Sequence, residues 1–264
     1  MLNRRTFLAA GAALPVGLRH TFAQAGDQPL RARAAARGLL FGAAAGWPAL
    51  RDDSEYASHF AEECGILVPE NVLKMGPVHP EPDRYNFEPG DFMADFCAKN
   101  NMQMRGHTLV WHAQTWPWLK AEVNQQNARK HLEDHIRTVA GHYRGRMHSW
   151  DVVNEAIQVE DGREDGLRKT PLLELLGPDY IEIAFRAARE ADPKALLCYN
   201  DYGLDYDTPG QERKRAAVLA LLRRLKDRKV PIDALGTQAH LDWASQKDFK
   251  AETLQRFLGE VAAL

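Results

Sequence analysis

Cysteine is scarce in this chain, and its placement argues against the usual cysteine-based sites. The three cysteines, Cys64, Cys97 and Cys198, are odd in number and lie within apolar helical or strand patterns. Such placement is typical of buried free thiols rather than of a disulfide framework. No Cys-x-x-Cys or His-Glu-x-x-His pattern is present. We therefore expect no metal ion and no cofactor.

Strong net charge and long apolar runs are also lacking. The formal net charge is -2 and no cluster of Lys and Arg stands out, so nucleic acid is not an expected partner. The apolar run over residues 7–18 is too short to cross a bilayer, so a membrane anchor is not expected either.

The N-terminal residues predict an export signal. The twin arginine Arg4-Arg5 precedes the apolar run, and Ala23-Gln24-Ala25 offers a small-residue cleavage site. We expect residues 1–25 to be a twin-arginine-type signal peptide and the protein to be exported, either to a periplasm or to the medium. Residues 26–264 are then expected to form one domain with a sizeable core.

The rest of the sequence alternates strand-like apolar runs with amphipathic helical patterns. The expected strands lie near residues 38–42, 66–71, 104–111, 150–155, 195–201 and 232–240. Apolar residues at helical spacing predict helices near residues 53–64, 91–100, 132–139, 181–188, 218–225 and 254–261. This alternation predicts an α/β fold with a parallel sheet.

Polar residues gather where one expected strand after another ends. They are Glu70 and Asn71, His107 and His112, Asn154 and Glu155, Asn200 and Asp201, and Gln238 and His240. No Gly-x-Gly-x-x-Gly follows the first strand, which weakens a nucleotide-binding doubly wound fold. The repeated polar strand ends favour a (β/α)8 TIM barrel, whose active site is built at the C-terminal ends of its strands. About the first six βα units of such a barrel are present.

The run Trp150-Asp151-Val152-Val153-Asn154-Glu155 carries the strongest functional signal. It resembles a buried strand that delivers a carboxyl group to the open end of a sheet. Burial raises the pKa of a glutamate, and a protonated glutamate can act as a general acid. The alternative is a glutamate that caps a helix or pairs with an arginine on a loop.

Five ordered motifs resemble glycoside hydrolase family ten, the retaining endo-1,4-beta-xylanases. The likeness runs from about residue 41 to residue 264. The motifs are Glu70-Asn71-Val72-Leu73-Lys74, Arg105-Gly106-His107-Thr108-Leu109-Val110-Trp111-His112, Trp150-Asp151-Val152-Val153-Asn154-Glu155-Ala156, Tyr199-Asn200-Asp201-Tyr202 and Gln238-Ala239-His240. Met75 and Gly203 depart from the family, which usually has Trp and Asn there, and this puts subsite details in doubt.

The resemblance implies a role for each residue of the motifs. Glu155 would be the general acid/base, and Asn154 would hydrogen-bond the 2-hydroxyl of the sugar beside the scissile bond. The remaining implied contacts are Glu70, Asn71 and Lys74 on the non-reducing side of the cleft, His107 and Trp111 in the catalytic subsite, Gln238 steadying the acid/base, and His240 orienting the nucleophile. Xylan or a xylo-oligosaccharide is the implied partner, and a monomer is expected.

The nucleophile of the family is not found in the sequence. The resemblance implies a glutamate that ends the seventh strand, and no matching motif occurs before residue 264. Glu260 lies within the last helical pattern and is no substitute. We therefore expect a C-terminally truncated protein that is inactive alone. Without the facing carboxylate, the pKa of Glu155 is expected to fall back toward that of an ordinary glutamate.

Other roles stay open at this stage. The protein could be a non-catalytic xylan-binding protein, or a retaining barrel glycosidase that acts on beta-glucan. The side chains of Trp116, Trp118 and Trp243 either stack on sugar faces or pack against loops. His112 either lines the site or satisfies buried backbone groups.

Overall fold

Six parallel strands form one sheet in which the spatial order equals the order in the sequence. A computed structural model describes residues 28–264, so the predicted signal peptide lies outside the described residues. The strands are β1 Gly42–Ala45, β2 Ile66–Pro69, β3 Gln103–Trp111, β4 Ser149–Asn154, β5 Leu196–Asp201 and β6 Ala234–Thr237. Consecutive parallel strands joined by helices are the arrangement of a (β/α)8 barrel, and the prediction of six βα units is confirmed.

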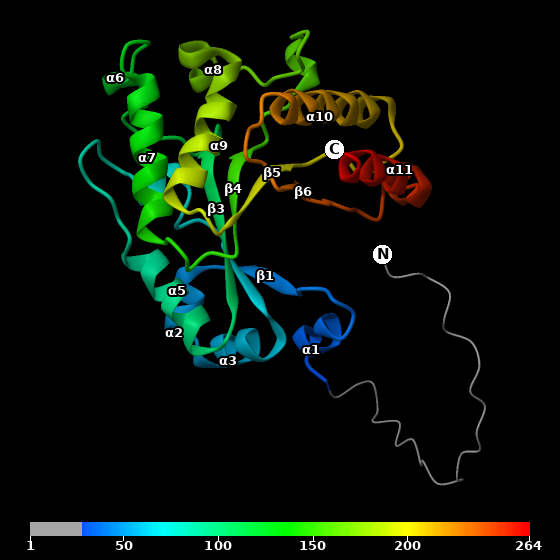
Figure 1. The fold of residues 1–264 in the computed structure, drawn as a ribbon. Coiled ribbons are helices and arrows are strands. Elements are labelled where there is room, and N and C mark those ends of the chain that lie inside the picture. The colour runs from blue at the N-terminus through cyan, green and yellow to red at the C-terminus, as the bar shows by residue number, and fades with distance from the viewer. Residues whose placement is uncertain (1–27) are drawn as a thin grey trace, which may run out of the picture.

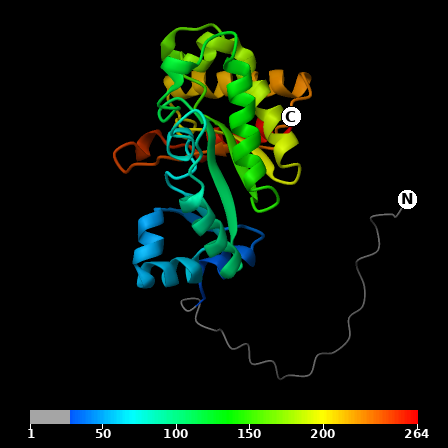
Figure 2. The same ribbon diagram turned by 90° about the vertical axis from the view of Figure 1, so that its left-hand side faces the viewer.

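The longer helices follow the outer face of the curled sheet (Figure 1). They match the six predicted helices: α3 Ser54–Glu63, α5 Glu88–Lys99, α7 Ala128–His142, α9 Tyr180–Ala191, α10 Pro209–Asp227 and α11 Ala251–Ala262. In the side view the early elements lie in the lower part of the molecule and the later ones above them (Figure 2). α7 and α9 each bury one apolar stripe, as the periodicity of the sequence requires.

Five short helices were not predicted. They are α1 Leu30–Ala35, α2 Trp47–Asp52, α4 Met75–Val78, α6 Leu119–Glu122 and α8 Pro171–Leu176. Each has four to six residues, which is too short for an apolar period to show in the sequence. No helix among residues 28–264 is long and apolar enough to cross a membrane.

The predicted first strand was placed too early in the chain. The apolar residues Leu39, Leu40 and Phe41 are largely exposed and precede β1, which begins at Gly42. Gly42 pairs with Ile66 of β2, and a Cβ at this glycine would lie 2.0 Å from the Ile66 carbonyl oxygen. Strand pairing therefore starts where a glycine permits close approach, not where the apolar run starts.

The core is densest around β4, the strand that ends beside Glu155. Every residue of β4 is buried. The indole ring of Trp150 covers Gly106 of β3 so closely that a Cβ there would lie 2.1 Å from the ring. The three cysteines are free and buried, as predicted. The strand that carries the site is thus held rigidly from both faces.

Candidate active site

A cleft of about 810 Å³ opens at the C-terminal ends of the strands. Seven of the nine predicted site residues line it: Glu70, His107, Trp111, Asn154, Glu155, Gln238 and His240. His107 lies in the middle of β3, and the other six come from the ends of β2, β3, β4 and β6 or from the residues just after them. Parallel strands end at one edge of a sheet, which is why residues far apart in the sequence meet here.

Both carboxylate oxygens of Glu155 accept hydrogen bonds in the cleft. Its Oε2 accepts a hydrogen bond of 2.8 Å from Nε1 of Trp111. Its Oε1 accepts bonds of 3.0 Å from Nε2 of Gln238 and 3.2 Å from Nδ2 of Asn154. Donors from β3, β4 and the end of β6 therefore fix both carboxylate oxygens, and Gln238 contacts the residue that it was predicted to steady.

Burial alone does not set the pKa of Glu155 within the described residues. Burial does raise its pKa, but the hydrogen bonds from Gln238 and Trp111 lower it, and the charges of His112 and Arg168 lower it further. The net result is a pKa below the ordinary glutamate value, because donors stabilise the charged form more than desolvation opposes it. The prediction that the pKa would not stay raised agrees with this direction.

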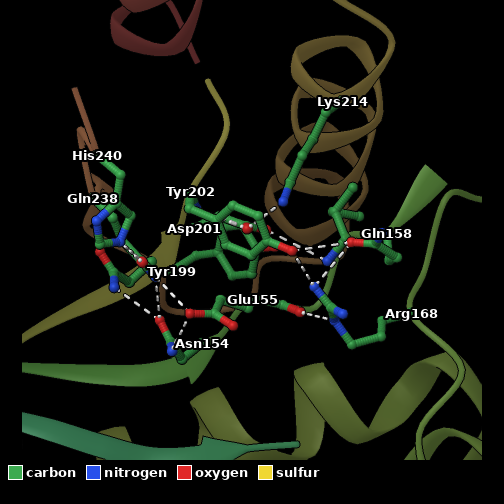
Figure 3. Close-up of polar contacts among 12 residues, drawn as sticks. Asn154, Glu155, Gln158, Arg168, Tyr199, Asp201, Tyr202, Lys214, Gln238 and His240 are labelled. Atoms are coloured by element: carbon green, nitrogen blue, oxygen red, sulfur yellow. Dashed lines mark hydrogen bonds and ion pairs between the residues drawn. The ribbon is translucent and has the colours of Figure 1, made fainter. Parts of the chain in front are cut away.

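Asn154 and His240 belong to the same network (Figure 3). Oδ1 of Asn154 accepts hydrogen bonds from Nδ2 of Asn200 at 2.8 Å and from Nε2 of Gln238 at 3.1 Å. Nε2 of His240 lies 2.9 Å from Oε1 of Gln238. His240 is exposed and orients Gln238 directly, so its contact within the described residues is to the amide that holds Glu155.

Lys74 and Asn71 form a pair beside the cleft rather than lining it. Nζ of Lys74 donates a hydrogen bond of 2.9 Å to Oδ1 of Asn71 and lies 4.8 Å from the ring centroid of Trp111. Burial lowers the pKa of Lys74, while the charges of Glu70 and Glu155 oppose this shift. The ammonium group thus lies within cation–π distance of the Trp111 ring.

Asp151 is a site residue to which sequence reasoning gave no role. Its carboxylate is buried at the base of the cleft, where it pairs with Arg105 and lies 2.9 Å from Nδ1 of His107. A carboxylate can only accept, so Nδ1 of His107 carries a proton toward Asp151, and in the neutral imidazole Nε2 is then an acceptor. The alternation of side chains along β4 places Asp151 on the inward face, and this pattern is the signal in the sequence that could have identified it as a site residue.

A second group that the sequence did not reveal lies behind Glu155. Arg168, Gln158, Tyr202 and Lys214 connect the backbone of Glu155 to β5 and α10 (Figure 3). Arg168 stands 13 positions after Glu155 on a loop, and no local pattern marks it. Within the described part of the chain, no group of His, Cys, Asp or Glu side chains is arranged to hold a metal ion.

The tryptophans divide between core and surface. Trp116 and Trp118 are buried and stacked with ring centroids 4.9 Å apart, so they pack rather than present a face to sugar. Trp243 is 82% exposed on the segment after β6. Nδ1 of His112 is buried without a hydrogen-bond partner among residues 28–264, so this nitrogen satisfies no backbone group there.

The chain is similar to known xylanases over most of its length. The family model for glycosyl hydrolase family 10 matches residues 29–264. Endo-1,4-beta-xylanase B of Thermotoga neapolitana is 40% identical over 237 residues, which are 88% of this chain and 66% of that protein. Beta-1,4-xylanase of Dictyoglomus thermophilum is 42% identical over 204 residues, which are 76% of this chain and 55% of that protein. The chain thus spans less than two thirds of these relatives.

Solved structures give the same result. Native xylanase 10B from Thermotoga maritima has a TM-score of 0.79 and 37% identity, and the match covers 89% of this chain and 70% of that one. Xylanase 10B from Thermotoga petrophila, solved in complex with xylobiose, has a TM-score of 0.76 and 37% identity, with 88% and 70% covered.

Proposed function

This chain belongs to glycosyl hydrolase family 10, and from that membership we propose that it is the part of a retaining endo-1,4-beta-xylanase that contains the general acid/base residue. Glu155 is the general acid/base in this proposal, and internal beta-1,4-xylosidic bonds of xylan are the target. The observation that carries it is the carboxyl group of Glu155, held at the wall of the cleft by Trp111, Asn154 and Gln238.

The proposed reaction has two steps. In the first, Glu155 protonates the leaving glycosidic oxygen while a second carboxylate attacks the anomeric carbon; in the second, Glu155 activates the water that hydrolyses the glycosyl-enzyme. The two carboxyl groups of such enzymes lie about 5–5.5 Å apart. Asp151 lines the same cleft, but its carboxylate is engaged by Arg105 and His107. We propose a nucleophilic glutamate beyond residue 264, which leaves residues 1–264 alone without turnover.

The cleft supplies groups suited to a xylo-oligosaccharide. Asn154 lies beside the acid/base, as a partner for the 2-hydroxyl requires, and Nε2 of His107 is free to accept from a sugar hydroxyl. Glu70, Asn71 and Lys74 are proposed to hold the non-reducing side, and His240 to orient the nucleophile. Export under the direction of residues 1–25, and a monomeric state, complete the proposal.

Rescue by an added anion tests the reaction directly. We expect the 264-residue protein to bind xylotetraose and to leave phenyl β-xylobioside intact. With sodium azide in mildly acidic solution, the protonated fraction of Glu155 should react: the azide bonds to the anomeric carbon as the carbon–oxygen bond to phenol breaks, and Glu155 gives its proton to that oxygen. A single displacement inverts the centre, so the product should be the α-glycosyl azide. Glu155→Gln should abolish its formation.

The same measurements separate the two alternatives. Binding of xylotetraose with no azide product would indicate a non-catalytic xylan-binding protein. Binding of cellotetraose as tight as that of xylotetraose would instead favour a glycosidase acting on beta-glucan. Either result would overturn the proposed function.

A further inference from the structure

The backbone of Glu155 adopts a conformation that a glutamate rarely takes. Its φ is +59°, in the left-handed region. This region costs an L-residue about 1–2 kcal/mol, and a residue remains there only where its surroundings fix it. The change of direction comes directly after Asn154, the last residue of β4. The side chain of Glu155 is therefore aimed by a backbone that needs support.

Two hydrogen bonds hold this backbone unit from opposite sides. The N–H of Glu155 donates to the carbonyl oxygen of Asn200 at 2.8 Å, which continues the pairing of β4 with β5. The carbonyl oxygen of Glu155 accepts a bond of 2.8 Å from Nε of Arg168. The first bond is ordinary sheet pairing, whereas the second comes from a side chain on a loop.

The guanidinium group of Arg168 is itself fixed by neighbours. Its Nη2 donates to Oε1 of Gln158 and to the hydroxyl of Tyr202, both at 3.0 Å. The ring of Tyr202 lies 3.6 Å from Nζ of Lys214, and this ammonium pairs with the buried Asp201 at 2.8 Å. None of Arg168, Gln158, Tyr202 and Lys214 lines the cleft that Glu155 faces. These four residues support Glu155 from outside the cleft (Figure 3).

We propose that Arg168 is a positioning residue, which holds Glu155 in its left-handed conformation and thereby aims the acid/base carboxyl group into the cleft. Only the description of Glu155 as the general acid/base rests on the proposed function. The structural content of the proposal is that the conformation of Glu155 depends on Arg168.

The positive charge of Arg168 also lowers the pKa of Glu155. Burial raises the pKa of Glu155, and Arg168 is among the groups that lower it, after Gln238, Trp111 and His112. The other charged or titratable groups around Glu155 are Lys74, Glu70, His107, Asp151 and His240. A cation behind Glu155 favours the carboxylate, which is the form that activates water in the second step.

Nuclear magnetic resonance of Glu155 tests the proposal without requiring turnover. The backbone and carboxyl carbon signals of Glu155, identified by their loss in Glu155→Gln, are followed with pH in the 264-residue protein. In Arg168→Gln we expect the Cα and Cβ shifts to leave left-handed values and the pKa of Glu155 to rise. The matched control is Arg163→Gln, which removes a charge from the same loop at an arginine that pairs with Asp165. It should change neither signal.

A conservative variant separates position from charge. Arg168→Lys keeps the positive charge but has no fork to reach the carbonyl of Glu155 and the hydroxyl of Tyr202 together. We expect its backbone shifts to move while the pKa of Glu155 stays near that of the wild type. This variant also carries the test should Arg168→Gln fail to fold.

The two proposals fail separately. Unchanged Cα and Cβ shifts of Glu155 in both Arg168 variants would overturn the positioning role, even if azide still gave the glycosyl azide. Moved shifts together with no azide product would leave the positioning role intact and overturn the proposed function.

Discussion

The indole nitrogen of Trp111 donates a hydrogen bond of 2.8 Å to Oε2 of Glu155. The donor comes from the last residue of β3 and the acceptor from the residue after β4, so the bond spans two neighbouring strands. A donor of this kind stabilises the carboxylate rather than the acid. The position of Trp111 in the cleft therefore lowers the pKa of Glu155.

Trp111→Phe should raise the pKa of Glu155. The hydrogen bond from Trp111 lowers this pKa, and the loss of a hydrogen bond to a charged group costs about 1.5–3 kcal/mol. Phenylalanine keeps an aromatic ring near Lys74, so the main loss is the N–H group that donates to Glu155. Carbon-detected titration of Glu155 measures the shift. Trp243→Phe, at an exposed tryptophan, is the control and should leave the titration unchanged.

The contribution of Glu155 to stability should depend on pH. Its pKa in the folded protein lies below the ordinary value, so its charged form stabilises the fold above that value, and this contribution is lost as the pH falls through the folded pKa. Glu155→Gln should therefore lower the Tm at pH 7, by an amount that shrinks below about pH 4.5. Glu122→Gln, at an exposed position, serves as the control. A deficit that grew on acidification would contradict the assignment.

Lys214→Met should destabilise the protein strongly. Lys214 and Asp201 are both buried and form an ion pair of 2.8 Å. Removal of one partner of a buried pair leaves an uncompensated charge and costs about 3–5 kcal/mol. Lys130→Met removes an exposed pair with Asp134 and should cost less than about 0.5 kcal/mol. Urea unfolding of the two variants measures the difference, and equal losses would refute the buried role of Lys214.

Two glycine substitutions should have opposite effects. Gly106→Ala places a Cβ about 2.1 Å from the ring of the buried Trp150, so overpacking should cost about 1–3 kcal/mol or more. Gly141→Ala lies within α7, where nothing stands within 4 Å of the added Cβ. Alanine there should stabilise the helix by about 0.5–1 kcal/mol. Thermal unfolding shows whether each substitution raises or lowers the Tm. An unchanged Tm in Gly106→Ala would contradict the packing of β3 on β4.

The sheet could be predicted well from the sequence where burial leaves a pattern. β2 to β6 lie within or next to the predicted ranges. β2, β4, β5 and β6 are short and are followed by or end in polar residues, whereas β3 is a longer run that mixes apolar and polar residues. The predicted first strand was displaced because Leu39 to Phe41 are apolar but precede the paired segment. Short helices such as α8 leave no period to detect. Local patterns thus predicted the elements whose burial is regular along the chain.

Most of the predicted site residues lie together in one cleft because they sit at or near strand ends, which a parallel sheet brings to one edge. Gln238 and Glu155 are 83 residues apart, and the motifs that contain them indicated a shared site before the contact of 3.0 Å was known. Arg168 was missed because a single loop arginine has no pattern. Asp151 was passed over because an inward-facing acid on a strand does not reveal its partner.

By itself the sequence determined the order of strands and helices, the residues at the strand ends and the likeness to one family, because these properties depend on local composition and spacing. Only the tertiary structure decided the charge state favoured at Glu155 and the support of its backbone. Both depend on the balance between desolvation and hydrogen bonds from Trp111, Gln238 and Arg168. That balance is set by distances in space between residues that the chain keeps far apart.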